Sequence, residues 1–354
     1  MSSLIVEAVR INEMKEHGNA DKLELAMCKG WQCIVPKGKY KSGDLVIYIP
    51  IDTVFPQAFS DKLGITQYLS HQGNNVLRSK TIKLRGVISQ GIIVSPDEVP
   101  GVKEGDDVAE KLGLTKWEPP VSGMPQIAGM PRRQHPDFWK FTDIENIKNY
   151  PDVLVEGEEV VISEKIHGTN FRVGMLSLMS YTWWDKVKNW FKRLRGQNYE
   201  LHVGSHNVDL QDTGNNLYWK VARRYEFEKF LKPNAIVFGE IYGKGVQKLT
   251  YGLEDVEVKF FDAMQDGKYV DHEVFLAFCS FHGLPVVPGL YYGPWKKELL
   301  GLAEGKSTIA DHMREGFVVK PTKERWDQRG GRVTFKAISS QYLLKDFDEG
   351  GVNH

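Results

Sequence analysis

The chain has 354 residues, of which 41% are apolar and 26% are charged, and its 46 basic residues balance 46 acidic ones. This composition is typical of a soluble globular protein long enough for two domains, and any polyanion-binding surface must be a local patch. No apolar run approaches the roughly 18 residues of a membrane span. No basic region precedes a long apolar core at the N-terminus, so we expect a cytoplasmic protein without a secretory signal.

The cysteines and histidines do not form a metal-binding or disulfide pattern. Cys28, Cys33 and Cys279 are too few and too scattered for a disulfide framework or a four-ligand zinc site. The ten histidines show no HExxH or comparable spacing. We therefore expect reduced, structural thiols.

Residues 1–115 read as short strands separated by turns. β-Branched and aromatic residues are concentrated in five segments, which are 23–28, 31–36, 45–50, 81–86 and 91–95. Five strands suit a small β-barrel of the OB type, whose basic and aromatic residues can follow a phosphate backbone. A solvated basic face is an equal alternative. The residues in question are Lys37, Lys39, Lys41, Arg78, Lys80, Lys83, Arg85, Trp31, Tyr40 and Tyr48.

A linker and a second domain follow. Residues 116–136 contain five prolines and no periodic apolar pattern, which is typical of a linker. Thr142 and Glu145 have the spacing of a capping box, so we predict that the domain at 137–354 opens with a short helix. Its apolar residues at helical spacing are Ile144, Ile147 and Tyr150.

The second domain is predicted to be mostly antiparallel α+β, because strand-like segments alternate with turns and a few helices. These segments are 159–166, 170–176, 201–205, 235–243, 256–264, 316–321 and 332–339.

An amphipathic helix at 181–195 interrupts the strand pair that follows the segment EKIHGTN. Packing of the helix on its own domain is the favoured interpretation, and a basic, aromatic clamp on nucleic acid is the alternative. Its apolar stripe consists of Trp183, Val187, Trp190 and Leu194. The basic residues on its other faces are Lys186, Lys188, Lys192, Arg193 and Arg195.

The segment EKIHGTN places Lys165 at the end of an apolar strand, with Gly168 three residues later. A glycine there can take a positive φ and lets a phosphate-bearing ligand approach the backbone. A lysine nucleophile must lose its proton from a reference pKa of about 10.4, and neighbouring cations or desolvation can lower that pKa. Taken alone, a K-x-x-G motif marks a surface lysine beside a turn more often than a site.

Four further segments follow in order along the chain, and together they favour a functional site over a surface lysine beside a turn. FGEIYG places Glu240 between glycines at a strand end, and KFFDAM places Phe261 where a purine could stack. EGFVVK offers Glu315, a carboxylate suited to hydrated magnesium, and VTFK brings Lys336 late in the chain. Five such elements in one order rarely arise by chance.

Together these segments resemble the covalent nucleotidyltransferases, which include polynucleotide ligases and capping guanylyltransferases. EKIHGTN is similar to the lysine motif of nick-sealing RNA ligases, in which His replaces the Asp common in DNA ligases. GNADKLELA and LRGVISQGI resemble the OB domain of RNA ligases whose accessory domain precedes the catalytic one. The implied fold class is α+β, with an N-terminal OB-like β-barrel and an antiparallel α+β nucleotidyltransferase domain of the ATP-grasp-like ligase type.

The resemblance also implies ATP and Mg²⁺ or Mn²⁺ as cofactors and AMP carried on Lys165. It places Glu164 near the adenine, Glu240 at the ribose and Phe261 against the base, and it assigns metal-bound water to Glu315. The remaining implied nucleotide-binding residues are Lys320 and Lys336 at the α-phosphate, His167 and Asn170 at phosphates, and Ile166 and Gly168 of the lysine motif.

Two positions depart from the family pattern. An arginine usually follows the strand after the lysine motif, but VGSHN offers Ser205, His206 and Asn207 there. Thr334 stands where many relatives have a second lysine, which leaves Lys336 more charge to balance.

We therefore expect an ATP-dependent RNA ligase that joins 3′-hydroxyl and 5′-phosphate ends at nicks in RNA or RNA/DNA duplexes, as a monomer without a membrane partner. A DNA ligase or capping guanylyltransferase is disfavoured by His167 and by the N-terminal position of the OB domain. A non-catalytic OB protein with a degenerate transferase domain is disfavoured by retention of Lys165, Glu240, Glu315 and Lys336.

Overall fold

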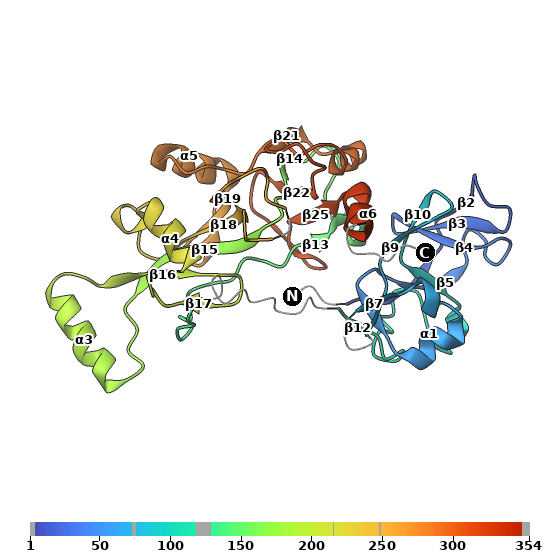
Figure 1. The fold of residues 1–354 in the computed structure, drawn as a ribbon, viewed down its shortest axis with the longest axis horizontal. Coiled ribbons are helices and arrows are strands. Elements are labelled where there is room, and N and C mark those ends of the chain that lie inside the picture. Colours follow the sequence, from blue (N-terminus) through green and yellow to red (C-terminus); the bar gives the residue numbers. More distant parts are fainter. Residues whose placement is uncertain (1–3, 73–75, 118–128, 215, 248, 349–354) are drawn as a thin grey trace. The chain divides into compact units, whose positions relative to one another are not determined.

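The computed structural model describes residues 4–72, 76–117, 129–214, 216–247 and 249–348. These residues form two compact units (Figure 1). The first unit draws on Met1–Val121, Glu145–Asp152 and Ile338–His354, and the second on Ser122–Ile144 and Val153–Ala337. The predicted domain limits stay a prediction, since residues 118–128 of the expected linker lie outside the described residues.

Short antiparallel strands build the first unit. Sheets of order β1-β5-β11, β2-β3-β4 and β12-β6-β8-β7 accompany the hairpin β9-β10. All five predicted segments contain strands, namely β3 (Leu23–Cys28), β4 (Trp31–Pro36), β5 (Leu45–Ile49), β9 (Thr81–Leu84) and β11 (Ile92–Val94). The other strands are β1 (Glu7–Arg10), β2 (Glu13–Glu16), β6 (Thr53–Phe55), β7 (Ser70–Gln72), β8 (Val76–Arg78), β10 (Val87–Gln90), β12 (Thr115–Lys116) and β13 (Glu145–Asn146).

The aromatic residues expected on the nucleic-acid face of this unit lie in its core instead. Trp31, Tyr40 and Tyr48 are all buried in one apolar cluster. Alternation along β4 turns Trp31 inward, where its indole donates a hydrogen bond of 3.1 Å to Asn149. The expectation that these three rings help to follow a phosphate backbone was therefore wrong. The lysines at 37, 39 and 41 are exposed, so a basic surface without these rings stays a prediction.

The helix predicted to open the second domain is also wrong. The segment forms strand β13 and the short 3-10 helix η4 (Ile147–Asn149). The Thr142 hydroxyl lies 3.1 Å from the Tyr269 hydroxyl and is not a helix cap. Asn146 instead accepts a hydrogen bond of 3.0 Å from the Lys148 amide, which starts the 3-10 turn later in the chain.

Two antiparallel sheets make up the second unit. One has the order β17-β16-β15-β18-β19-β20, and the other contains β25-β22-β14-β21. Each segment predicted as a strand in this unit contains a strand. These strands are β14 (Glu159–Glu164), β15 (Thr169–Ser177), β16 (Tyr199–Gly204), β18 (Ala235–Gly243), β19 (Val256–Gln265), β22 (Gly316–Pro321) and β25 (Phe335–Ile338). Shorter or unpredicted strands are β17 (Asp209–Leu210), β20 (Lys268–Tyr269), β21 (Gly289–Pro294), β23 (Trp326–Asp327) and β24 (Gly331–Arg332).

Helices cover the six-stranded sheet, and the core lies between them and the strands. Phe171 and Phe260 of the sheet pack in one cluster with Trp219 of α4 (Leu217–Arg224) and Phe275 of α5 (His272–His282). The remaining helices are α1 (Gln57–Leu63), α3 (Trp183–Leu194), α6 (Ser340–Asp348) and the 3-10 helices η1 (Thr66–Tyr68), η3 (Pro96–Glu98), η5 (Phe227–Lys229) and η6 (Lys297–Ala303). None of the helices in the described ranges has the length and apolar character needed to cross a bilayer.

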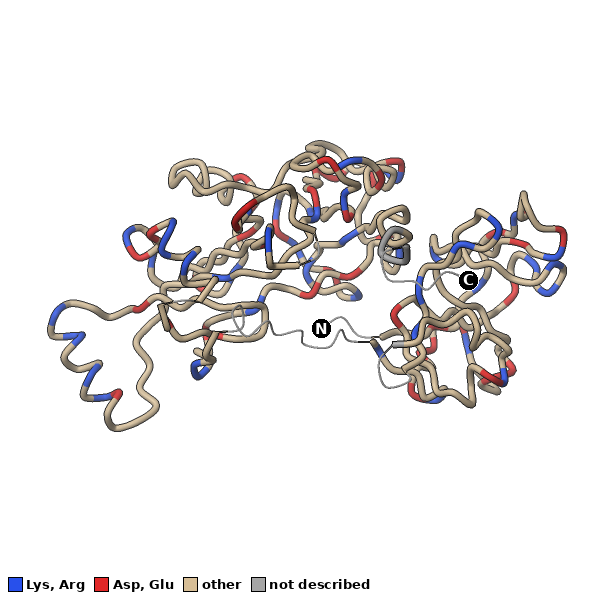
Figure 2. The backbone as a smooth tube through the Cα atoms, in the orientation of Figure 1, with Lys and Arg blue, Asp and Glu red and all other residues tan. Residues whose placement is uncertain are grey.

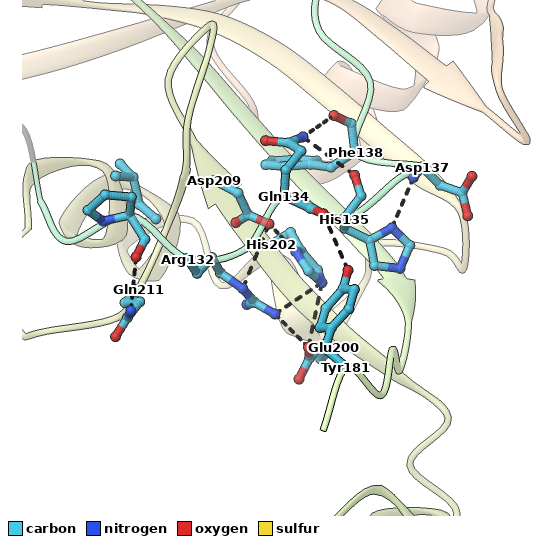
Figure 3. A network of polar contacts seen from close by, with 12 residues as sticks. Arg132, Gln134, His135, Asp137, Phe138, Tyr181, Glu200, His202, Asp209 and Gln211 are labelled. Atoms are coloured by element: carbon cyan, nitrogen blue, oxygen red, sulfur yellow. Dashed lines mark hydrogen bonds and ion pairs between the residues drawn. The ribbon is translucent and has the colours of Figure 1, made fainter. Parts of the chain in front are cut away.

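Ion pairs attach the segment before Phe138 to the hairpin β16-β17 (Figure 3). Arg132 contacts Glu200 at 2.7 Å and Asp209 at 3.7 Å, and the His202 ring lies 2.7 Å from Asp209. Hydrogen bonding to His202 leads the effects that lower the pKa of Glu200. The hairpin is therefore held at its base by a network of charged side chains.

Helix α3 lies in the connection between β15 and β16 and stands away from the sheet (Figure 1). Its predicted stripe does not pack on its own domain, since Trp183 is 65% and Trp190 57% exposed. The favoured packing interpretation is wrong because Asn189, on the opposite face, is the residue that becomes buried.

Candidate active site

A cavity of about 490 Å³ lies in the second unit. Its walls come from β14, β15, β18, β19, β21, β22 and helix α5. The volume is within the range that small-molecule sites occupy. The cavity brings together seven of the predicted site residues, which are Glu164, Lys165, Ile166, Asn170, Glu240, Phe261 and Lys320.

Lys165 follows the last residue of β14, and the neighbouring strand β22 holds its backbone. The Lys165 amide donates a hydrogen bond of 3.0 Å to the Gly316 carbonyl. This pairing brings Glu315, which directly precedes β22, beside the lysine, and the Lys165 Nζ lies 2.7 Å from the Glu315 Oε1. The carboxylate of Glu164 accepts hydrogen bonds of 2.8 and 2.6 Å from the amide and hydroxyl of Thr308.

The charges around Lys165 oppose its deprotonation. Burial alone would lower the pKa of Lys165, but the carboxylates of Glu315 and Glu240 outweigh it and hold the pKa above its usual value. Burial raises the pKa of Glu240 to about 8, against the attraction of Lys165. For Glu315 burial also acts upward, yet the Lys165 ammonium and His167 bring its pKa below the usual value. Sequence reasoning offered neighbouring cations or desolvation as the means of lowering this pKa; the structure supplies the desolvation but places anions beside the lysine.

His167 approaches the same carboxylate from the other side. Its Nδ1 lies 3.7 Å from the Glu315 Oε2, and its backbone amide donates a hydrogen bond of 2.7 Å to the Tyr251 hydroxyl. Tyr251 was not singled out from sequence, because an isolated aromatic residue in a turn carries no motif. The loop that carries Lys165 is therefore fixed at both of its backbone ends.

Gly168 serves close packing and not a positive φ, so this part of the prediction was wrong. Its φ lies outside the left-handed region that favours glycine. A Cβ on Gly168 would come within 2.2 Å of the Ile241 carbonyl oxygen and 3.0 Å of the Glu240 Cγ. The close approach that requires glycine is to strand β18 of the protein itself.

Asn170 and Glu240 face each other across β15 and β18, as directly paired residues of the two strands. The side-chain oxygen of Asn170 is buried and has no hydrogen-bond partner among the described residues. An orphaned buried acceptor calls for a partner from outside the chain. The pair therefore offers polar contacts to a ligand in the cavity.

A β-bulge aims Phe261 into the cavity. The register between β18 and β19 passes from Phe238 opposite Asp262 to Gly239 opposite Phe260, which leaves Phe261 unpaired. Because a bulge breaks strict alternation, Phe261 and Asp262 both line the cavity while Phe260 stays in the core. The Phe261 ring also packs edge-on against Phe141, with centroids 4.8 Å apart.

Comparison with known proteins gives this arrangement a family. The RNA ligase family matches residues 158–338, and an OB-fold domain matches residues 5–96. The chain belongs to the RNA ligase family. The expected α+β architecture with an N-terminal OB-fold region is confirmed.

Solved structures similar to this ligase cover almost all of it. A variant of Naegleria gruberi RNA ligase with AMP and Mn is 25% identical, with a TM-score of 0.79 over 96% of this chain and 98% of that one. The same ligase with PPi is 26% identical, with a TM-score of 0.78 over 97% and 99%. Another variant with ATP and Mn is 25% identical, with a TM-score of 0.78 over 96% and 98%. No curated protein sequence matches the chain.

Lys320 of the ligase lies in a charged network that sequence reasoning missed. Its Nζ is 3.0 Å from Asp262 and 3.3 Å from Glu324. Arg332, fully buried, contacts the same two carboxylates at 2.6 Å each and lies over the Tyr269 ring. Asp262 lies within the segment KFFDAM, and Arg332 directly precedes VTFK. Their positions beside motif residues were the only sequence signal for this network.

Two predicted contacts fall elsewhere. The cavity wall includes Thr334 but not Lys336. The buried Arg172 side chain donates a hydrogen bond of 2.8 Å to the Ser205 carbonyl oxygen. The Asn207 side chain accepts a hydrogen bond of 2.9 Å from Lys140. The region of the missing family arginine is thus occupied by contacts within the ligase.

In the described part of the ligase, no group of three or more His, Cys, Asp or Glu side chains is arranged to hold a metal ion. Glu315 and Glu240 nevertheless both act electrostatically on Lys165, and the Oε2 of Glu315 has no hydrogen-bond partner among the described residues. Mg²⁺ is usually held by one or two carboxylates together with waters and substrate phosphates. The donor set therefore fits a hydrated divalent cation that arrives with its nucleotide.

Proposed function

We propose that the ligase seals RNA with ATP by carrying AMP on Lys165. The observation that carries this proposal is the position of the Lys165 amine, on the wall of a nucleotide-sized cavity and 2.7 Å from Glu315. Family membership and the similarity to structures of Naegleria gruberi RNA ligase with ATP, AMP and Mn support it.

Three transfers follow. The neutral amine of Lys165 attacks the α-phosphorus of ATP, so that a P–N bond forms, the P–O bond to pyrophosphate breaks and the amine proton goes to solvent. The 5′-phosphate of an RNA end then takes the AMP and frees the lysine. Finally a 3′-hydroxyl attacks the activated 5′-phosphate and releases AMP, which leaves a phosphodiester bond.

The polar residues of the cavity singled out from the sequence, together with Phe261, have roles in this proposal. Phe261 offers a ring against the adenine, and Asn170 and Glu240 offer polar atoms to the ribose and phosphates. Glu164, held by Thr308, lies on the adenine side. Lys320 carries the positive charge for the α-phosphate, and Asp262 and Glu324 keep its ammonium in place. Catalysis by such a site rests on positioning and charge neutralisation.

A divalent cation, Mg²⁺ or Mn²⁺, would be held by Glu315 with Glu240. When bound it neutralises the carboxylates that raise the lysine pKa and stabilises negative charge on the phosphates. Glu315 thereby acts on Lys165 in both states of the enzyme, as its ion-pair partner before the nucleotide binds and as a cation ligand afterwards.

The substrate we propose is a nick with a 5′-phosphate in RNA or in an RNA/DNA duplex. The N-terminal OB-fold region supports a role in holding the nucleic acid, since OB folds commonly bind polynucleotides. Sealing of a panel of RNA, DNA and mixed nicks would rank these substrates on one gel series.

The nucleophile is tested by substitution. Lys165→Ala should abolish AMP transfer to the protein and sealing with ATP, and Lys165→Arg should fail too, because a guanidinium stays protonated. Both variants should still join a strand already activated with 5′-linked AMP. Lys244→Ala, at an exposed lysine, is the control and should seal normally.

Mass spectrometry after incubation with ATP and magnesium should place one AMP on the peptide that contains Lys165. An adduct on another peptide, or ATP-dependent sealing by Lys165→Ala, would falsify the assignment.

A further inference from the structure

Helix α3 presents an apolar face to solvent. Trp184 is 66% exposed, Phe191 53% and Leu194 65%, in addition to Trp183 and Trp190. Together with Val187 these side chains fall within about a third of the helix circumference. Monomeric proteins rarely leave so continuous an apolar surface uncovered unless it binds something.

The chain fixes this face outward. Thr182 and Asp185 form a capping box, with hydrogen bonds of 3.1 and 2.8 Å, that starts the helix. Asn189, on the opposite face, donates to the Met179 carbonyl at 2.9 Å. Lys192 contacts Glu200 at 3.0 Å and so connects α3 to the polar network at the base of the hairpin.

Cations flank the apolar face on both sides. Five basic residues and one acidic residue lie between Trp183 and Arg195, and Figure 2 shows the basic positions along α3. The acidic one, Asp185, is used in the cap. Lys186, Lys188 and Arg195 are exposed, and no salt bridge within the described ranges involves them.

We propose that α3 binds the surface of an anionic phospholipid bilayer. An apolar stripe with Trp and Phe, bordered by Lys and Arg, lets the rings enter the headgroup region while the cations meet lipid phosphates. The 12-residue helix would lie in the plane of the interface and not span it. This association is compatible with the composition, which excludes only a span.

RNA fits this face less well. Trp183 packs edge-on against Trp184 at 4.7 Å, and Trp190 against Phe191 at 4.8 Å, so the rings pair with each other. The middle of the stripe is aliphatic, at Val187 and Leu194, where no base stacks. A duplex offers phosphates to the cations but leaves the apolar stripe without an apolar partner.

A second copy of the chain is disfavoured by charge. Two α3 helices placed face to face would bring cationic borders against cationic borders, because both edges of the stripe are basic. A lipid surface supplies the opposite charge at both edges. Charge complementarity therefore selects the bilayer among these partners.

The test is sedimentation of the full chain with vesicles of phosphatidylcholine and phosphatidylglycerol in a three-to-one ratio, compared with pure phosphatidylcholine. The intact chain should bind the anionic vesicles about tenfold or more tightly than the neutral ones, and salt should weaken the binding. Trp190→Ser with Phe191→Ser should lose this binding. Lys186→Glu with Lys188→Glu and Arg195→Glu should lose it as well.

Matched controls are available at other exposed positions. Trp326→Ser with Phe281→Ser removes a Trp and a Phe that are 68% and 85% exposed, and it should bind vesicles like the intact chain. Lys103→Glu with Lys111→Glu and Lys297→Glu reverses three exposed charges elsewhere. An unchanged melting temperature and unchanged AMP transfer to the protein would show that the α3 variants are folded.

Three outcomes would overturn the proposal. The first is an intact chain that binds neither vesicle, or α3 variants that bind anionic vesicles as the intact chain does. The second is loss of binding to a nicked RNA by the α3 variants with vesicle binding unchanged, which would assign the face to RNA. The third is a dimer of the intact chain that the α3 variants dissolve, without vesicle binding.

Discussion

At the scale of single residues, the ligand-free site holds Lys165, the proposed nucleophile, in protonated form. Its ammonium lies 2.7 Å from the Glu315 carboxylate; burial would lower its pKa, but Glu315 and Glu240 outweigh this and raise it. A protonated lysine has no lone pair with which to attack phosphorus. The arrangement therefore keeps Lys165 protonated without ligand, and the AMP transfer that we propose requires ATP and a divalent cation to change the charge beside it.

Replacing Glu315 by Gln tests this charge balance without nucleotide. Loss of the anion should lower the pKa of Lys165, so a larger fraction of the amine is neutral at a given pH. The pH profile of its reaction with an amine-directed reagent should shift to lower pH, with a several-fold faster reaction near pH 8. Glu298→Gln, at an exposed glutamate, should leave the profile unchanged. A profile shifted to higher pH would contradict the interpretation.

Gly168→Ala tests the close approach of β15 to β18. The new methyl group would meet the Ile241 carbonyl and displace Glu240, at a cost of about 1–3 kcal/mol in the free energy of unfolding. Urea unfolding measures this cost, and AMP transfer to the protein should fall as Glu240 moves. Gly301→Ala is the control, because a Cβ there would meet no atom within 4 Å, and it should cost far less free energy of unfolding. Gly252→Ala would not serve, because its positive φ adds backbone strain. Equal stabilities of the two variants would refute the packing argument.

At the scale of elements, strands β19, β22 and β24 meet in one charged cluster at the wall of the cavity. Asp262 is fully buried; burial would raise its pKa, but Lys320 and Arg332 together lower it. A buried charge without its partner is far more costly than an exposed one. The cluster therefore couples the fold of three strands to the position of the lysine proposed for the α-phosphate.

Arg332→Met should be strongly destabilising, by about 3–5 kcal/mol, because it leaves two carboxylates to Lys320 alone. Arg329→Met removes an exposed arginine paired with Asp327 and should cost less than about 1 kcal/mol. Urea unfolding at pH 7 measures both. A carboxylate whose pKa is lower in the folded state stabilises the fold at pH values above its unfolded-state pKa. This stabilisation is lost as the pH falls through the folded-state pKa. The difference between wild type and Arg332→Met should accordingly shrink in acid, and a constant difference would rule out the charge explanation.

At the scale of the whole molecule, chemistry and substrate binding are assigned to different parts of the chain. The cavity and Lys165 lie in the second unit, and the match to an OB-fold domain lies at residues 5–96. Since Trp31, Tyr40 and Tyr48 of that region are buried, the exposed basic side chains remain as the groups expected to bind phosphates.

Lys37→Glu with Lys39→Glu and Lys41→Glu should therefore weaken sealing of a nicked RNA and leave AMP transfer to the protein unchanged. Sealing by the intact chain should also weaken as salt rises. The salt dependence should be less steep in this variant. The slope of log affinity against log salt concentration should be smaller by about 0.7–0.9 for each phosphate that the variant no longer neutralises. Lys103→Glu with Lys111→Glu, in the same unit, is the control. Normal sealing by the triple variant would show that this basic segment does not hold the substrate.

The amino-acid sequence by itself determined the strands, the order of the motifs and the choice of Lys165 as the proposed nucleophile. Strands such as β4 and β18 are visible locally because alternation and β-branched side chains report which residues leave water. The motif residues Lys165, Glu240 and Phe261 are visible because their chemistry requires particular neighbours along the chain.

Only the tertiary structure decided which groups meet. Lys165 and Glu315 are 150 residues apart, and nothing local specifies that one will be the anion beside the other. The bulge at Phe261 and the contact of Gly168 with β18 depend on register between strands. Periodicity likewise gave α3 an apolar stripe but not its surroundings, because amphipathicity states that a face avoids water and leaves open whether the chain or another surface covers it.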